Sequence, residues 1–155
     1  MARLVIECER RNLGLGKIAG AVYRTLGQVD NLKAELVFMG QEEIKQLNLQ
    51  TRKIDKVTDV LSYPTLENIR EKVLKKDEHP LDVENNKLFI GSIVLCNDKV
   101  KEQAKEFGHS LQRERTYLIV HGLMHLFGYD HMNDKDKKQM REKEKTALAE
   151  LGIQE

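Results

Sequence analysis

Residues 117–131 of the chain read YLIVHGLMHLFGYDH. From Tyr117 to Phe127 nearly every position is apolar, and a helix that is apolar on all sides is normally buried in the core of its protein. Two histidines interrupt this run, His121 and His125, and they are four residues apart. One turn of a helix therefore places their imidazoles one above the other on the same face. The stretch predicts a fold built around a buried helix that carries a histidine pair.

A third histidine, His131, follows six residues after His125, with Gly128 between them. A glycine can adopt the left-handed conformation that ends a helix and turns the chain back. Such a turn would let His131 approach the same metal ion as the helical pair. A single buried histidine is more often a hydrogen-bonded core residue than a ligand. Three histidines at this spacing, with a glycine at the required turn, indicate a metal centre.

Three neutral nitrogen ligands favour Zn²⁺ over Mg²⁺ or Ca²⁺, which prefer oxygen. Imidazole also binds Ni²⁺, Co²⁺ and Cu²⁺, so another divalent transition metal is an alternative. Three protein ligands leave a fourth position open, which is typical of catalytic rather than structural zinc. Asp130 lies beside His131 and either orients one of the ligands or is an ordinary exposed turn carboxylate.

The remainder of the chain alternates between short apolar segments, which predict strands, and segments of helical periodicity. Strands are expected at 3–8, 32–39, 59–63 and 87–96. Helices are expected at 14–27, 41–49, 98–107, 110–127 and 134–151, and the charged segment 65–86 is expected to be irregular, with a helical turn near 66–74. Strands and helices do not alternate strictly. The expected fold class is therefore α+β, with a small mixed sheet of about four strands packed with about five helices in a single domain, residues 1–155.

The composition limits the kinds of partner. The net charge is only +1, so binding to a nucleic acid would have to depend on a local basic patch. No apolar run approaches the roughly 20 residues of a membrane helix, and the N-terminus does not read as a secretory signal. A cytoplasmic protein without membrane contact is expected. Cys8 and Cys96 should then be reduced core residues, and His79 and His109 should lie on the surface.

The spacing of the histidines is shared with the metzincin class of zinc peptidases, which carry a glutamate directly after the first histidine as general base. Gly122 occupies that position here. Peptide hydrolysis would therefore lack its usual proton acceptor, which disfavours a peptidase.

Three motifs, taken together, resemble the YbeY-type endoribonuclease family. The first is HGLMHLFGYDH itself, residues 121–131. The second has the pattern Asn48-x₃-Arg52-x₂-Asp55-x₂-Thr58-Asp59 followed by VLSYP, and the third is GSIVLC, residues 91–96. They occur in the family's order, and the resemblance covers essentially the whole chain. The family usually has an acidic residue where this chain has Ser92, so the role of that carboxylate has no counterpart here.

The resemblance implies a metal-dependent RNase that cuts single-stranded RNA, acts in 3′-end maturation of small-subunit rRNA and in ribosome quality control, and has the small ribosomal subunit or its proteins as partners. It also implies that Arg52 is a catalytic and substrate-binding residue. A planar guanidinium that is always charged suits a phosphodiester. The alternative is an ordinary ion pair with Asp55 or Asp59. Lys56, nearby, would extend a phosphate-binding patch.

Two other functions stay open at this point. One is a different zinc hydrolase of the peptidase type, and the other is a ribosome-associated factor whose metal is structural. The last helix begins with DKDKKQMREKEK, residues 134–145, whose charges alternate in sign. This pattern indicates a solvated helix face rather than an RNA-binding tail.

Overall fold

The computed structural model describes residues 1–154, and within that range the chain forms five α-helices and a mixed sheet of five strands. The strands are β1 (Leu4–Glu7), β2 (Leu32–Met39), β3 (Val60–Pro64), β4 (Val83–Glu84) and β5 (Lys87–Cys96). The helices are α1 (Leu15–Thr25), α2 (Gln41–Arg52), α3 (Asn97–Phe107), α4 (Leu111–Leu126) and α5 (Asp134–Glu150). The expected α+β class and mixed sheet are confirmed.

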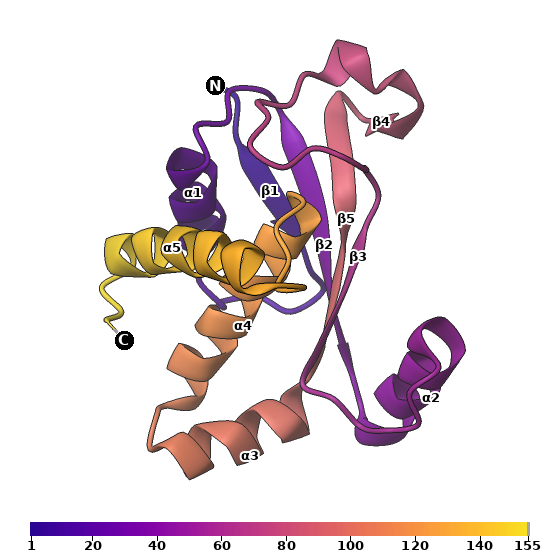
Figure 1. Ribbon diagram of the computed structural model, residues 1–155, viewed down its shortest axis with the longest axis vertical. Helices are drawn as coiled ribbons and strands as arrows, with labels where there is room; N and C mark the ends of the chain where they lie inside the picture. The colour runs from indigo at the N-terminus through magenta and orange to yellow at the C-terminus, as the bar shows by residue number, and fades with distance from the viewer. Residues whose placement is uncertain (155) are drawn as a thin grey trace.

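The sheet has the order β1-β2-β5-β3, with β4 paired to β5. β1, β2 and β5 are parallel, whereas β3 and β4 run antiparallel to β5. Helices α1, α4 and α5 lie on one side of this sheet and α2 lies on the other (Figure 1). The larger core fills the first side, and a smaller apolar cluster around Ile44 lies beneath α2. The sheet is therefore covered unequally on its two faces.

Helix α4 is the buried helix that the sequence predicted, and it packs against β3 and β5. Ser110 caps its N-terminus, where the side-chain oxygen accepts a hydrogen bond from the backbone N–H of Arg113. Gly122 lies against the sheet, where an added Cβ would come within 3.0 Å of the side chain of Ile93. Helix and sheet therefore approach closely at the level of the histidines.

The structure differs from expectation in three places. Helix α2 continues to Arg52 instead of ending near residue 49, and Lys53 closes it in the left-handed conformation. The short strand β4 was not expected. It pairs with β5 through a tight turn at Asn85 and Asn86, both at positive φ, a conformation that asparagine tolerates better than most residues.

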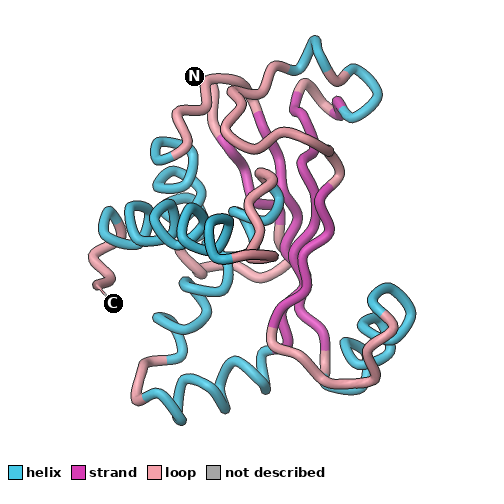
Figure 2. Tube along the Cα trace, in the orientation of Figure 1, coloured by secondary structure: helices cyan, strands magenta, loops and turns pink. Residues whose placement is uncertain are grey.

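The third difference concerns the segment between β3 and β4, which has no helical turn near 66–74. It runs as loop until the 3₁₀ turns at 76–78 and 80–82 (Figure 2). Three apolar residues nevertheless anchor it in the core: Leu66, Ile69 and Leu74. Their spacing resembles that of a helix face, although tertiary packing decides the conformation here.

Both cysteines are free thiols, Cys96 buried and Cys8 partly buried against the core, as expected. Among the described residues, no helix combines the length and the apolar character that a membrane crossing requires.

The substitution Gly91→Ala should destabilise the protein strongly. Gly91 has φ 140°, and an added Cβ would lie against the carbonyl oxygen of Tyr63 and 2.7 Å from Cδ2 of Leu126. Strained backbone and the clash together should lower the free energy of unfolding by about 3 kcal/mol, measured by urea denaturation. Gly16→Ala is the control, because Gly16 is an exposed helical residue with no atom within 4 Å of an added Cβ. That change should leave stability equal or slightly raised. Equal stability of the two variants would contradict the assignment of strain at Gly91.

Candidate metal centre

The helical pair has the spacing that a shared metal ion requires. His121 and His125 present their Nε2 atoms to each other at 3.2 Å. Two ligands on a tetrahedral zinc ion, each with a bond of 2.0–2.1 Å, lie about 3.3 Å apart. His131 completes the group, since one ring nitrogen from each histidine lies within 4.8 Å of the other two. The three histidines are therefore able to hold one metal ion.

A tight turn at Gly128 brings His131 to the helical pair. Gly128 has φ 95°, and its N–H donates to the carbonyl oxygen of His125 at 3.0 Å. The N–H of Tyr129 then reaches back to the carbonyl oxygen of Met124, also at 3.0 Å. This is the glycine-dependent helix ending that the sequence predicted, and it redirects the chain so that His131 returns toward the end of α4.

Two rings stack on the imidazole of His121. The centroid of the Tyr117 ring lies 6.1 Å from that of His121, and the centroid of the His131 ring lies 5.9 Å away. The ring of His125 meets the edge of the His121 ring at 89°. The cluster is therefore ordered by ring packing as well as by the backbone.

A carboxylate from α5 contacts His121 at the nitrogen that faces away from His125. Oε2 of Glu144 lies 2.5 Å from Nδ1 of His121, and Glu144 is only 4 % exposed. The expectation of a solvated face for residues 134–145 is therefore wrong at this position. Met140, Ala147 and Leu148 share the buried side of α5, and their spacing places Glu144 on that side.

His125 is uncharged at neutral pH. Burial, followed by the neighbouring His121 and His131 and by Arg52, lowers its pKa to about 4. A neutral imidazole keeps a lone pair for a metal ion, so the environment favours His125 as a ligand.

Arg70 fixes the loop that carries His131. Its Nε donates to the carbonyl oxygen of Gly128 at 3.0 Å, its Nη2 to Oδ2 of Asp130 at 2.7 Å, and its Nη1 to Oδ1 of Asp136 at 2.8 Å. Asp130 thus contacts Arg70 rather than a histidine, so the carboxylate acts on the loop and not directly on a ligand. One guanidinium joins the segment after β3, the histidine loop and the start of α5.

Arg52 is exposed at the end of α2, and its Nη2 donates to the carbonyl oxygen of Ser62 on β3 at 3.1 Å. β3 packs against α4, and the positive charge of Arg52 contributes to the lowered pKa of His125. Within residues 1–154 Arg52 forms no ion pair with a carboxylate, and Asp55 pairs instead with Lys45 at 3.9 Å. The side chain of Lys56 is exposed in the following loop, where the structure gives it no contact with the histidines.

Comparison with known proteins decides the family. Residues 9–152 match the family described as Endoribonuclease YbeY. The chain belongs to this family. A Clostridium beijerinckii protein named Endoribonuclease YbeY is 47 % identical over 130 residues, which cover 79 % of this chain and 78 % of that protein. A Clostridium kluyveri protein of the same name is 48 % identical over 118 residues, 73 % of this chain and 72 % of that protein.

A solved structure agrees with the fold. The solution structure of TM1509 from Thermotoga maritima has a TM-score of 0.59 and 29 % identity to this chain, and the match covers 97 % of this chain and 89 % of that protein.

Ser92 and Gly122 are the two positions where the sequence lacks an expected carboxylate. Ser92, where YbeY-type proteins usually have an acid, pairs with Tyr63 and Glu35 across the sheet, whereas its neighbour Ile93 points to α4. Because side chains alternate along a strand, Ser92 faces away from α4. Gly122, where metzincins have glutamate, lies so close to β5 that an added Cβ would be 3.0 Å from the side chain of Ile93. Neither position supplies a carboxylate to the histidines.

Sequence reasoning missed Glu144 and Arg70. The buried residues of α5 offered a signal for Glu144, which the alternating charges obscured. Arg70 had no local signal, because its partners Asp130 and Asp136 lie 60 and 66 residues further along the chain. His79 and His109, expected on the surface, are partly buried, and His109 lies 3.4 Å from the buried carboxylate of Glu114.

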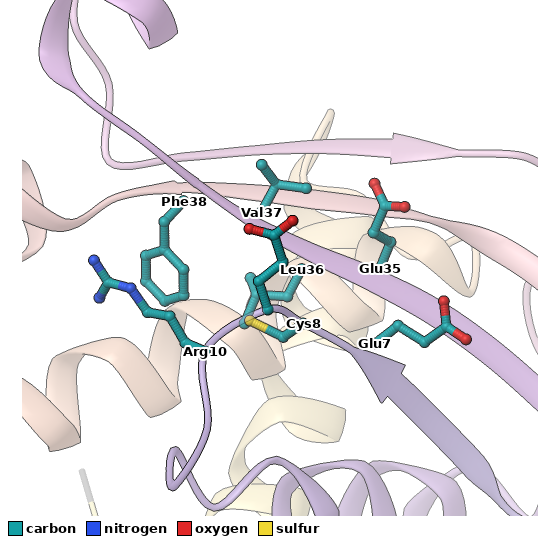
Figure 3. A pocket seen from close by; sticks show the side chains of 8 residues that line it. Glu7, Cys8, Arg10, Glu35, Leu36, Val37 and Phe38 are labelled. Atoms are coloured by element: carbon teal, nitrogen blue, oxygen red, sulfur yellow. The ribbon is translucent and has the colours of Figure 1, made fainter.

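A separate hollow of about 660 Å³ lies where β1 ends beside β2 (Figure 3). Glu7, Glu9 and Glu35 line it, and the one arginine, Arg10, lies over the ring of Phe38 at 4.1 Å. Three carboxylates repel a phosphate backbone, so this hollow does not suit a nucleic acid.

Arg70→Ala should loosen the loop of residues 128–133. Removing the guanidinium leaves the carbonyl of Gly128 without this donor and takes the arginine contact away from Asp130 and Asp136, which keep local donors from Met132 and Asn133. Amide hydrogen exchange in this loop should accelerate, and the free energy of unfolding should fall by about 1–2 kcal/mol, since the ion pairs are partly exposed. Arg141→Ala, at an exposed arginine of α5, is the control and should change neither the hydrogen exchange of the loop nor the free energy of unfolding. Unchanged exchange in the Arg70 variant would show that the loop is held by other contacts.

Proposed function

We propose that this chain is a zinc-dependent endoribonuclease that cuts single-stranded RNA, acts in 3′-end maturation of small-subunit rRNA, and takes part in ribosome quality control. The observation that carries the proposal is the cluster of three histidine nitrogens within 4.8 Å, together with the guanidinium of Arg52, which is held by β3 and whose charge acts on His125. Membership of the endoribonuclease YbeY family supports the reaction class.

The donor set supports zinc. His121, His125 and His131 would hold the ion through nitrogen alone, and no carboxylate is in the group. Zinc, when bound, supplies Lewis-acid activation of the phosphodiester and of water. The protein's own part is to keep His125 neutral by burial, to hold His131 through the Gly128 turn, and to leave His131 accessible from solvent.

Arg52 supplies the positive charge for the phosphodiester. One Nη atom is fixed by the carbonyl of Ser62, which orients the guanidinium while leaving other N–H groups available. No carboxylate neutralises it in the described structure, so its full charge is available to the non-bridging oxygens and to the charge that develops during cleavage. Lys56 extends this patch along the RNA backbone.

Recognition on this basis depends mainly on the phosphates. The chain has four tyrosines, four phenylalanines and no tryptophan, and the net charge is +1. Extensive base stacking and strong non-specific binding are both disfavoured. The small ribosomal subunit or its proteins would then present the strand to the metal centre, in the cytoplasm where rRNA is processed.

The first experiment is elemental analysis of protein purified under mild conditions, without chelators. About one Zn²⁺ per chain is expected. His125→Ala should lose the metal while far-ultraviolet circular dichroism shows that the fold persists. Absence of metal in the wild type, even after zinc addition and dialysis, would remove the basis for a metalloenzyme.

The second experiment measures cleavage of labelled single-stranded RNA, with the same sequence as a duplex for comparison. Arg52→Ala should bind zinc normally but cut about 100-fold more slowly, because it loses a donor to the developing charge. Arg52→Lys should recover only part of the rate, since a lysine keeps the charge but not the planar fork. Arg141→Ala serves as the charge-matched control and should cut at the wild-type rate.

Three results would contradict the assignment. Full RNase activity of Arg52→Ala with normal zinc binding would remove the catalytic role of Arg52. Cleavage of peptides with RNA left intact would favour the peptidase-type alternative. Zinc binding without cleavage of isolated RNA or of small ribosomal subunits would favour a structural metal in a ribosome-associated factor.

A further inference from the structure

Glu144 is a buried carboxylate with a specific partner. It lies on the inner side of α5 among Met140, Ala147 and Leu148, and its side chain is 5 % exposed. Its Oε2 is 2.5 Å from Nδ1 of His121. An ionised carboxylate taken out of water is strongly destabilising unless a donor or a positive charge compensates it. The side chain that contacts Glu144 is His121, so its imidazole has to supply the donor that stabilises the buried carboxylate.

The contact decides which nitrogen of His121 carries the proton. A neutral imidazole has one N–H and one lone pair, and a carboxylate can only accept. Nδ1 must therefore donate to Glu144, which leaves the lone pair on Nε2. Nε2 is the atom that lies 3.2 Å from Nε2 of His125. The tautomer selected by Glu144 is thus the one that can bind a metal ion between the two histidines.

The same contact fixes the rotation of the ring. The rings of Tyr117 and His131 lie nearly parallel to the His121 imidazole, but a 180° flip about its Cβ–Cγ bond would keep the same ring plane and exchange the positions of its nitrogen and carbon atoms. The hydrogen bond at Nδ1 removes that freedom and directs Nε2 toward His125. His125 has a different arrangement, because it hydrogen-bonds to the backbone of Tyr129 instead of to a carboxylate.

We propose that Glu144 is a positioning residue of the metal centre, which selects the Nδ1–H tautomer of His121 and orients its Nε2 toward the metal ion. The inference rests on the proposed metal centre. A metal ion on Nε2 also supplies, through the ring, the positive charge that the buried carboxylate lacks. Loss of such a partner typically weakens metal binding by about 10- to 100-fold.

The test compares the wild type with Glu144→Gln, a variant of nearly the same shape that lacks the negative charge. Zn²⁺ affinity is measured by competition with a chromophoric chelator. The tautomer of His121 is measured in the metal-free protein by ¹⁵N nuclear magnetic resonance of the imidazole, at mildly alkaline pH. Glu142→Gln is the control, because Glu142 is exposed on the same helix.

The wild type should show His121 with its proton on Nδ1. Glu144→Gln should bind zinc about 10- to 100-fold more weakly, and His121 should become a mixture of tautomers, because a glutamine can donate as well as accept. Glu142→Gln should match the wild type in both measurements. A purely structural role for Glu144 would change stability without changing the tautomer.

The proposal is overturned if metal-free wild type carries the proton on Nε2, if Glu144→Gln leaves the tautomer unchanged, or if that variant keeps wild-type zinc affinity. Failure of the wild type to bind zinc is a different result, since it removes the metal centre itself. The tautomer measurement in metal-free protein needs neither zinc nor RNase activity, and therefore separates the two cases.

Discussion

The close approach of α4 to the sheet is the contact on which the rest of the site depends. Gly122 allows it, because any side chain at that position would press on Ile93 of β5. A helix seated this tightly cannot rotate about its axis without opening the core. The direction in which His121 and His125 point is therefore set by packing on an adjacent side of the helix, because Gly122 follows His121 directly in α4. An apolar contact thus determines the geometry of a polar centre.

Much of this arrangement could be read from the sequence because its causes are local. The apolar run of α4 predicts burial, the four-residue spacing of His121 and His125 predicts a shared face, and Gly128 predicts the turn. Each of these depends on residues within one or two turns of helix. The strands that pack beneath α4 were found for the same reason, since their apolar residues form short runs of their own.

The parts that could not be predicted depend on contacts between distant segments. Glu144 lies in a helix of alternating charges, and only the packing of α5 shows that this one carboxylate faces inward. The segment 66–74 has the apolar spacing of a helix, yet its apolar residues Leu66, Ile69 and Leu74 anchor a loop to the core. β4 exists because two asparagines accept positive φ, a weaker signal than a glycine would have given.

Because of the Arg70 contact, the three histidines do not come together at the same stage of folding. His121 and His125 come together as soon as α4 forms, since they lie within one turn. The place of His131 depends on an arginine 58 residues before Gly128, and therefore on a contact of long sequence separation. A contact of this kind carries the entropy cost of closing the intervening loop, which contacts within one turn of helix do not. A partly folded chain would present two imidazoles to a metal ion, and the third only once the segment after β3 has docked.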